Sequence, residues 1–64
     1  MIAVAFETMS GTSVAALDAE SAPLVGEEVE IDHRMWRVLK RRWRVSATKK
    51  LVVFEFVEEV KPRG

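Results

Sequence analysis

The sequence of 64 residues contains no cysteine. A disulfide framework and a cysteine-based zinc site are therefore excluded, and so small a domain must rely on packed apolar side chains or on a partner subunit. Only three glycines and two prolines interrupt the chain, and no glycine-rich phosphate-binding loop is present. No apolar run is long enough to span a membrane, so we expect a soluble, cytoplasmic protein with no membrane contact.

The chain also lacks net charge, because ten basic residues balance ten acidic ones. A formal charge of zero gives no overall attraction to nucleic acid or to an anionic membrane. The basic residues are nevertheless concentrated, since eight of the ten lie between positions 34 and 50 with acidic segments on either side. A local anionic contact therefore remains open, although the whole chain is neutral.

Groups suited to catalysis are scarce. His33 is the only histidine, and a general base needs an orienting group and a sheltered cleft that a predicted turn does not provide. The pairs Glu27-Glu28 and Glu58-Glu59 alternate across predicted strands, so they do not converge on a metal ion. No serine or threonine lies in a nucleophile elbow. We expect no enzymatic activity, no metal, no cofactor and no small-molecule substrate.

Apolar–polar alternation in "GEEVEIDHRMWRVLK" predicts a first central hairpin. Val29 and Ile31 alternate with acidic residues, and Trp36 and Val38 resume the pattern after a turn. We place a two-residue loop at His33-Arg34, with a longer loop as the alternative, because this pair is not favoured in such turns. The predicted cross-strand pairs are Ile31–Trp36, Val29–Val38, Glu30–Arg37 and Glu27–Lys40.

The segment "WRVSATKKLVVFEF" predicts a second hairpin with a four-residue loop at Ala47–Lys50. Its predicted pairs are Val45–Val52, Trp43–Phe54 and Arg42–Glu55. This register turns Trp43, Phe54 and Phe56 inward, and it places Leu51, Val53 and Val57 on the opposite face.

The two hairpins share one strand, and their registers conflict. Trp36 and Val38 are even-numbered, whereas Trp43 and Val45 are odd-numbered, so a regular strand would send the two pairs to opposite faces. One extra residue near Leu39–Arg42 reconciles them. The parity change therefore predicts a β-bulge and a strongly bent sheet.

The N-terminal third has two interpretations. "MIAVAFET" reads as a strand, and Ser10-Gly11 is a turn dipeptide. A hairpin closed there pairs Phe6–Ala15, Val4–Leu17 and Ile2–Ala19. In the alternative, residues 13–20 form a short helix capped by Thr12 or Ser13, which gives an α+β fold on a three- to four-stranded sheet.

The preferred fold is all-β: five short, strongly bent antiparallel strands in a meander, forming one domain at 1–60 with a frayed tail at 61–64. The segments "PLVGEEVEI", "MWRVLKRRW" and "LVVFEFVEEV" resemble those of small SH3-like barrels, and the resemblance covers Met1–Val60. The chain is also similar to short β-proteins of bacterial and phage genomes, which implies a phage-derived or accessory protein. It has no tyrosine, so the proline-rich peptide recognition of signalling SH3 domains is not implied.

Two functions remain after these exclusions. The first is a non-enzymatic module that binds a protein partner or a second copy of itself through surplus apolar surface. Its candidate residues are Met35, Leu39, Leu51, Val53 and Val57. The second is a small barrel that binds single-stranded nucleic acid through cations with no predicted acidic partner. These cations are Arg34, Arg41, Arg44, Lys49 and Lys50. Inward-facing tryptophans argue against the second function, because a stacking platform must be exposed.

Overall fold

The computed structural model describes residues 1–61 and contains five strands and no helix in this range. The all-β prediction is confirmed. The alternative helix at 13–20 is wrong, because this segment pairs with the first strand. The predicted tail at 61–64 falls, apart from Lys61, outside the described residues. The strands are β1 (Ile2–Thr8), β2 (Ser13–Ala19), β3 (Glu28–Ile31), β4 (Arg34–Val45) and β5 (Leu51–Glu59).

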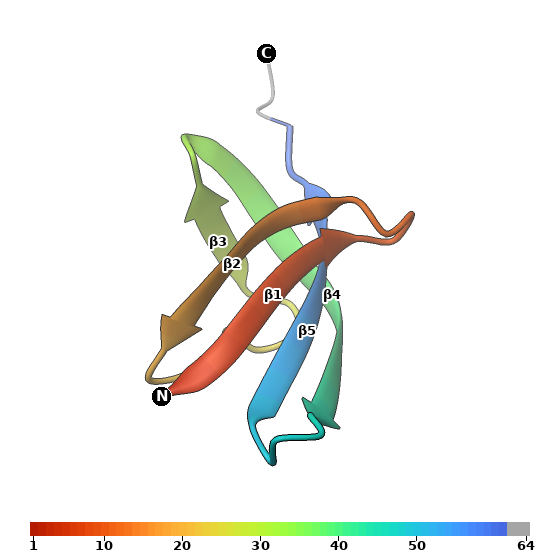
Figure 1. Ribbon diagram of the computed structural model, residues 1–64. Helices are drawn as coiled ribbons and strands as arrows, with labels where there is room; N and C mark the ends of the chain where they lie inside the picture. Colours follow the sequence, from red (N-terminus) through yellow and green to blue (C-terminus); the bar gives the residue numbers. More distant parts are fainter. Residues whose placement is uncertain (62–64) are drawn as a thin grey trace.

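The strands form one sheet in the order β2-β1-β5-β4-β3. Three of the four strand pairs are antiparallel hairpins, as a meander requires, but β1 pairs with β5 in parallel. The sheet curls strongly into a half-barrel (Figure 1). Its two edges, β2 and β3, are not paired with each other, so the fold is a small SH3-like barrel left open along this seam.

The core lies on the inner, concave face of the sheet. Val4 and Phe6 of β1, Val38 of β4, and Val53 and Val57 of β5 are all buried. Half-buried side chains of β3 and β4, among them Val29, Ile31 and Trp36, pack over this cluster. Curling brings the two edges toward each other, so five strands enclose an apolar interior that a flat sheet would expose.

The predicted register of the first hairpin is confirmed. Phe6 faces Ala15, Val4 faces Leu17 and Ile2 faces Ala19. Gly11 has a φ of 92°, a conformation that glycine adopts without steric cost. The turn dipeptide and the alternation of β1 were therefore sufficient to fix this element.

The β3–β4 register differs from the prediction by two residues. The loop is Asp32-His33, one position earlier than expected, so Val29 faces Trp36 and Glu28 faces Arg37. Asp32 and His33 both have positive φ, 51° and 66°, as a primed hairpin turn requires at both central positions. Because the error is two residues, each side chain still lies on the predicted face.

The predicted bulge is confirmed at the first position of its range. The β4–β5 ladder shifts between Val38 and Lys40, which leaves Leu39 as the extra residue. Trp36 and Val38 before the bulge, and Trp43 and Val45 after it, consequently share the inner face. The bulge thus bends β4 so that one strand serves both hairpins.

The β4–β5 register differs from the prediction by one residue. Val45 faces Leu51, Trp43 faces Val53 and Arg42 faces Phe54. The loop holds five residues instead of four, because Lys49 adopts a left-handed conformation, with a φ of 64°, inside a turn closed by Ser46 and Lys50. A slip of one residue reverses the faces of a strand. Val53, Glu55 and Val57 therefore point inward, and Phe54 and Phe56 point outward.

Candidate binding surfaces on the two faces of strand β4

Arg41, predicted as a free surface cation, forms a buried ion pair with Glu55. Its Nε lies 3.1 Å from Glu55 Oε1, and the Glu55 side chain is 0% exposed. The register slip explains the difference, because it moves Glu55 from Arg42 on the outer face to Arg41 on the inner face. Arg41 is therefore a structural residue and is not available to an anionic partner.

The same guanidinium fastens the crossing loop between β2 and β3. Arg41 Nη2 donates to the backbone carbonyl of Ala22 at 3.0 Å, and it also donates to that of Pro23. The Arg41 Cζ atom lies 5.4 Å from the centre of the Trp43 ring, within range of a cation–π interaction. One side chain thus links β5, the loop and a tryptophan of its own strand.

The other predicted cations are exposed but scattered. Arg34 approaches Glu59 at 3.9 Å, and such an exposed pair contributes little stability. Arg44 lies near the far end of β4, and Lys49 and Lys50 lie in or beside the β4–β5 loop. Arg37, expected to pair with Glu30, instead pairs with Glu28 at 2.9 Å.

The predicted apolar interface is not assembled as one surface. Val53 and Val57 are buried core residues, so the expectation that they lie on an exposed strip is wrong. Met35, Leu39 and Leu51 are exposed by 38%, 36% and 44%. However, Met35 and Leu51 lie at opposite ends of the β4–β5 ladder, which separates them by most of the length of β4.

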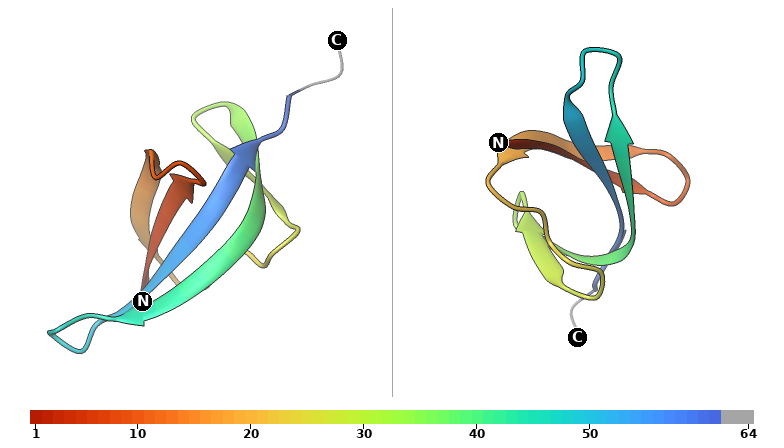
Figure 2. Two further views of the ribbon diagram at one scale, coloured as in Figure 1. Left: turned by 90° about the vertical axis from the view of Figure 1, so that its right-hand side faces the viewer. Right: turned by 90° about the horizontal axis from the view of Figure 1, so that it is seen from below.

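A different apolar surface occupies the inner face of the β4–β5 hairpin. This hairpin extends past the rest of the sheet as an arm (Figure 2). Trp43, Val45 and Leu51 share its inner side and are exposed by 45%, 63% and 44%; we call these three residues the arm patch. Trp43 was expected to be buried, but within residues 1–61 no strand reaches over the arm to cover it.

The outer face of β4 and β5 has a different chemistry. Lys40 lies opposite Phe56 and Arg42 lies opposite Phe54, with Arg44 next along the strand. The three cations are exposed and make no ion pair within residues 1–61, and the two rings are half-buried. We call these five residues the basic–aromatic face. The sequence did not indicate this face, because the predicted β4–β5 register turned both phenylalanines inward and paired Arg42 with Glu55. The predicted β3–β4 register, in turn, paired Lys40 with Glu27.

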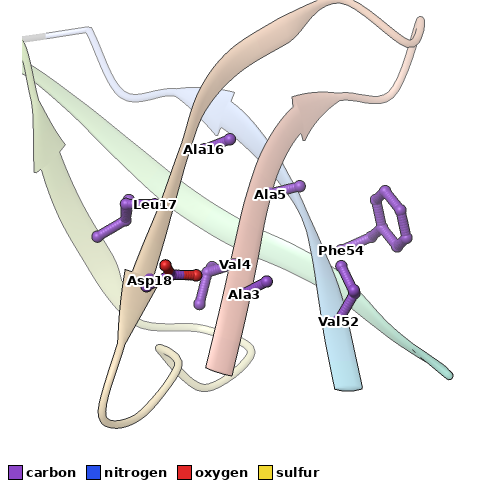
Figure 3. A pocket seen from close by; sticks show the side chains of 8 residues that line it. All are labelled: Ala3, Val4, Ala5, Ala16, Leu17, Asp18, Val52 and Phe54. Carbon is purple, nitrogen blue, oxygen red and sulfur yellow. The ribbon is translucent and has the colours of Figure 1, made fainter. Parts of the chain in front are cut away.

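A shallow hollow of about 410 Å³ adjoins this face. Ala3 and Ala5 of β1 and Ala16 of β2 line it beside Val52 and Phe54, and their side chains project from the same side of the sheet (Figure 3). Because alanine carries only a methyl group, these three residues leave open space beside the Phe54 ring; we call them the alanine floor of the hollow. Alternating small residues in "IAVAFET" and "SVAALDA" were the available signal for this hollow.

No protein-family model, curated protein or solved structure matches the chain. Within residues 1–61, no group of three or more histidine or acidic side chains is arranged to hold a metal ion. The described part of the chain also contains no helix that could cross a membrane. His33, the sole histidine, is exposed at the β3–β4 turn.

Proposed function

We propose that the protein is a non-enzymatic binding module that acts through protein–protein contacts, with a second copy of the chain as the partner that covers the arm patch. The observation that carries this proposal is the exposure of Trp43, Val45 and Leu51 on one side of a projecting hairpin. Large apolar side chains grouped in this way are typical of an interaction site, and tryptophan is among the residues enriched in the centres of interfaces.

The shape of the molecule supports the same proposal. The chain exposes 4845 Å², whereas a compact monomer of its mass exposes about 4,200 Å². Its radius of gyration is 12.0 Å, against about 11 Å expected for a globular domain of this length. A projecting arm that places apolar side chains away from the core is consistent with both values. A two-fold contact between two such arms would cover the patch on each chain.

Sedimentation velocity over a concentration series of the purified protein tests the proposal. We expect a concentration-dependent dimer. The V45T/L51T variant should weaken dimerisation about tenfold or more, because each dimer would lose four apolar groups worth about 0.8 kcal/mol per buried methylene. Threonine retains β propensity, so the fold should be kept.

The control is M35T/L39T, which removes two exposed apolar side chains of β4 that lie outside the arm patch. This variant should dimerise like the unmodified protein. A chain that remains monomeric at every concentration would overturn the proposal, as would equal effects of the two double variants.

A further inference from the structure

We propose that the basic–aromatic face binds single-stranded nucleic acid, with the phosphates along β4 and the bases over β5 and the alanine floor of β1. This site lies on the opposite side of the sheet from the arm patch and does not depend on dimerisation. The inference rests on the register of β4 and β5, on the unpaired charges, and on the hollow beside Phe54.

The spacing of the cations suits an extended polyanion. Lys40, Arg42 and Arg44 occupy alternate positions of one strand, so their Cα atoms recur about every 6.6–6.8 Å. This repeat is close to the distance between successive phosphates of an extended single strand. None of the three has an acidic partner within the described residues, so each guanidinium or ammonium group is available to a phosphate.

The aromatic rings lie one strand away, in register with the cations. Phe56 lies beside Lys40 and Phe54 beside Arg42, at the usual separation of about 4.8 Å between neighbouring strands. A nucleotide whose phosphate contacts β4 would therefore hold its base over β5. Stacking of bases on exposed aromatic rings is the usual means by which small β-sheets bind single strands.

The acidic residues of the same face determine which strand the phosphates of the ligand can occupy. Glu7 lies beside Phe56, Asp18 lies on the edge strand β2, and Glu58 lies opposite Arg37. These carboxylates repel phosphates from the β1–β2 side of the sheet and from the end of the β4–β5 ladder at Arg37 and Glu58. The uncharged bases can nevertheless extend across the floor formed by Ala3 and Ala5. The charge asymmetry thus favours one placement, with the backbone on β4.

A duplex does not fit this arrangement. Its bases are stacked and paired, so their faces cannot reach Phe54 or Phe56, and only the phosphate contacts would remain. We therefore expect clear preference for a single strand over a duplex of the same length.

Fluorescence anisotropy with a labelled oligothymidylate, and with a labelled duplex as comparison, tests the proposal in the full chain. With three phosphate contacts, log K should fall with log[salt] with a slope of about −2. The R42Q/R44Q variant should reduce this slope by about 1.4 and weaken binding at low salt. Its matched control is R34Q/R37Q, which removes the same charge from the same strand but takes cations that already approach glutamates.

Two uncharged variants test the stacking surface. Phe54→Leu keeps an apolar strand residue but removes the ring, and it should weaken single-strand binding about 5- to 150-fold. Ala5→Leu raises the floor next to Phe54 and should also weaken binding, with the salt slope unchanged. Thermal unfolding of each variant confirms that the sheet is intact.

The proposal is overturned if the oligothymidylate does not bind at low salt, if the duplex binds equally well, or if R34Q/R37Q is as impaired as R42Q/R44Q. Unchanged affinity of the folded Phe54→Leu variant would likewise contradict the stacking arrangement. Loss of binding in V45T/L51T would place the site on the arm patch and overturn the assignment to the outer face.

Discussion

Glu55 is the one charged residue within the core of the described chain, and its burial depends on Arg41. The pair lies 3.1 Å apart, and the second carboxylate oxygen, Oε2, has no hydrogen-bond partner among the described residues. Burial of charges costs several kcal/mol per ion before their attraction is counted, so such a pair adds little net stability. Its effect is on specificity. An inward Glu55 is acceptable only in the register that places Arg41 opposite it.

Replacement of one member of this pair should therefore cost more than replacement of both. We expect Glu55→Leu to lower the free energy of unfolding by about 3–5 kcal/mol, because Arg41 loses its counter-ion. This is a large part of the roughly 3–10 kcal/mol expected for 64 residues. The double variant R41M/E55L should lose less. Urea denaturation measures both, and equal losses would contradict this account of the pair.

At the scale of elements, the β3–β4 turn combines the required geometry with unfavourable residue types. Asp32 and His33 both have positive φ, and a left-handed conformation costs a non-glycine residue about 1–3 kcal/mol. Asp-Gly is among the preferred sequences for this turn, whereas Asp-His is not. His33 makes none of the described side-chain hydrogen bonds or ion pairs that could offset this cost.

His33→Gly should consequently stabilise the protein. Relief of the strain, less the conformational entropy of glycine in the unfolded chain, leaves about 0.5–1 kcal/mol. The melting temperature should rise by about 2–8 °C, as measured by circular dichroism. Arg34→Gly, one residue later and inside β4, should lower it. A decrease for His33→Gly similar to that for Arg34→Gly would show that the turn does not have positive φ at this position.

The elements differ in how far their sequence determines them. β1 alternates large apolar residues with small or polar ones and is followed by a glycine turn, so the register of the β1–β2 hairpin followed from these two features together. The bulge at Leu39 followed from a parity conflict within β4. In contrast, β5 carries apolar residues on both faces, so either face satisfies the hydrophobic pattern, and the left-handed conformation of Lys49 that selects one of them has no sequence signal.

The same ambiguity decided the candidate sites. Compared with the predicted register, Val53 and Val57 lie in the core instead of on the surface. Phe54 lies on the surface instead of in the core. Arg41 lies opposite Glu55 on the inner face, while Arg42 lies opposite Phe54 and no longer faces an acidic residue. Of the cations predicted to be free, Arg44 retains that status beside the newly exposed rings. The identity of a binding surface on so thin a sheet thus depends on a register choice of a single residue.

At the scale of the whole molecule, the parallel β1–β5 ladder joins two parts. One part is the β1–β2 hairpin, and the other is the three-stranded sheet of β3, β4 and β5. Six residue pairs from Ala3–Val52 to Thr8–Val57 connect them, together with the clamp of Arg41 on Ala22 and Pro23. An isolated two-stranded hairpin is marginally stable at best in water, so β1 and β2 require the other part in order to fold.

Fragments 1–24 and 25–64 should therefore reassemble when mixed. We expect the circular dichroism spectrum of the mixture to show more β structure than the sum of the separate spectra. The cut falls in the crossing loop after both carbonyls that accept from Arg41, so the clamp is retained. As a control, Arg41→Met in the second fragment should weaken reassembly. A mixture whose spectrum equals that sum would show that the covalent loop, and not the ladder, holds the parts together.

The order in which the strands are synthesised gives the parallel ladder a further consequence. β1 is translated well before β5, with the whole of 9–50 between them, so the nascent β1–β2 hairpin has no partner until the final strand has left the ribosome. Non-local pairing of this kind also slows folding in solution. Until β5 has emerged, the apolar residues of "IAVAF" remain available to chaperones or to other nascent chains. The folded sheet can form only after translation of β5 is complete.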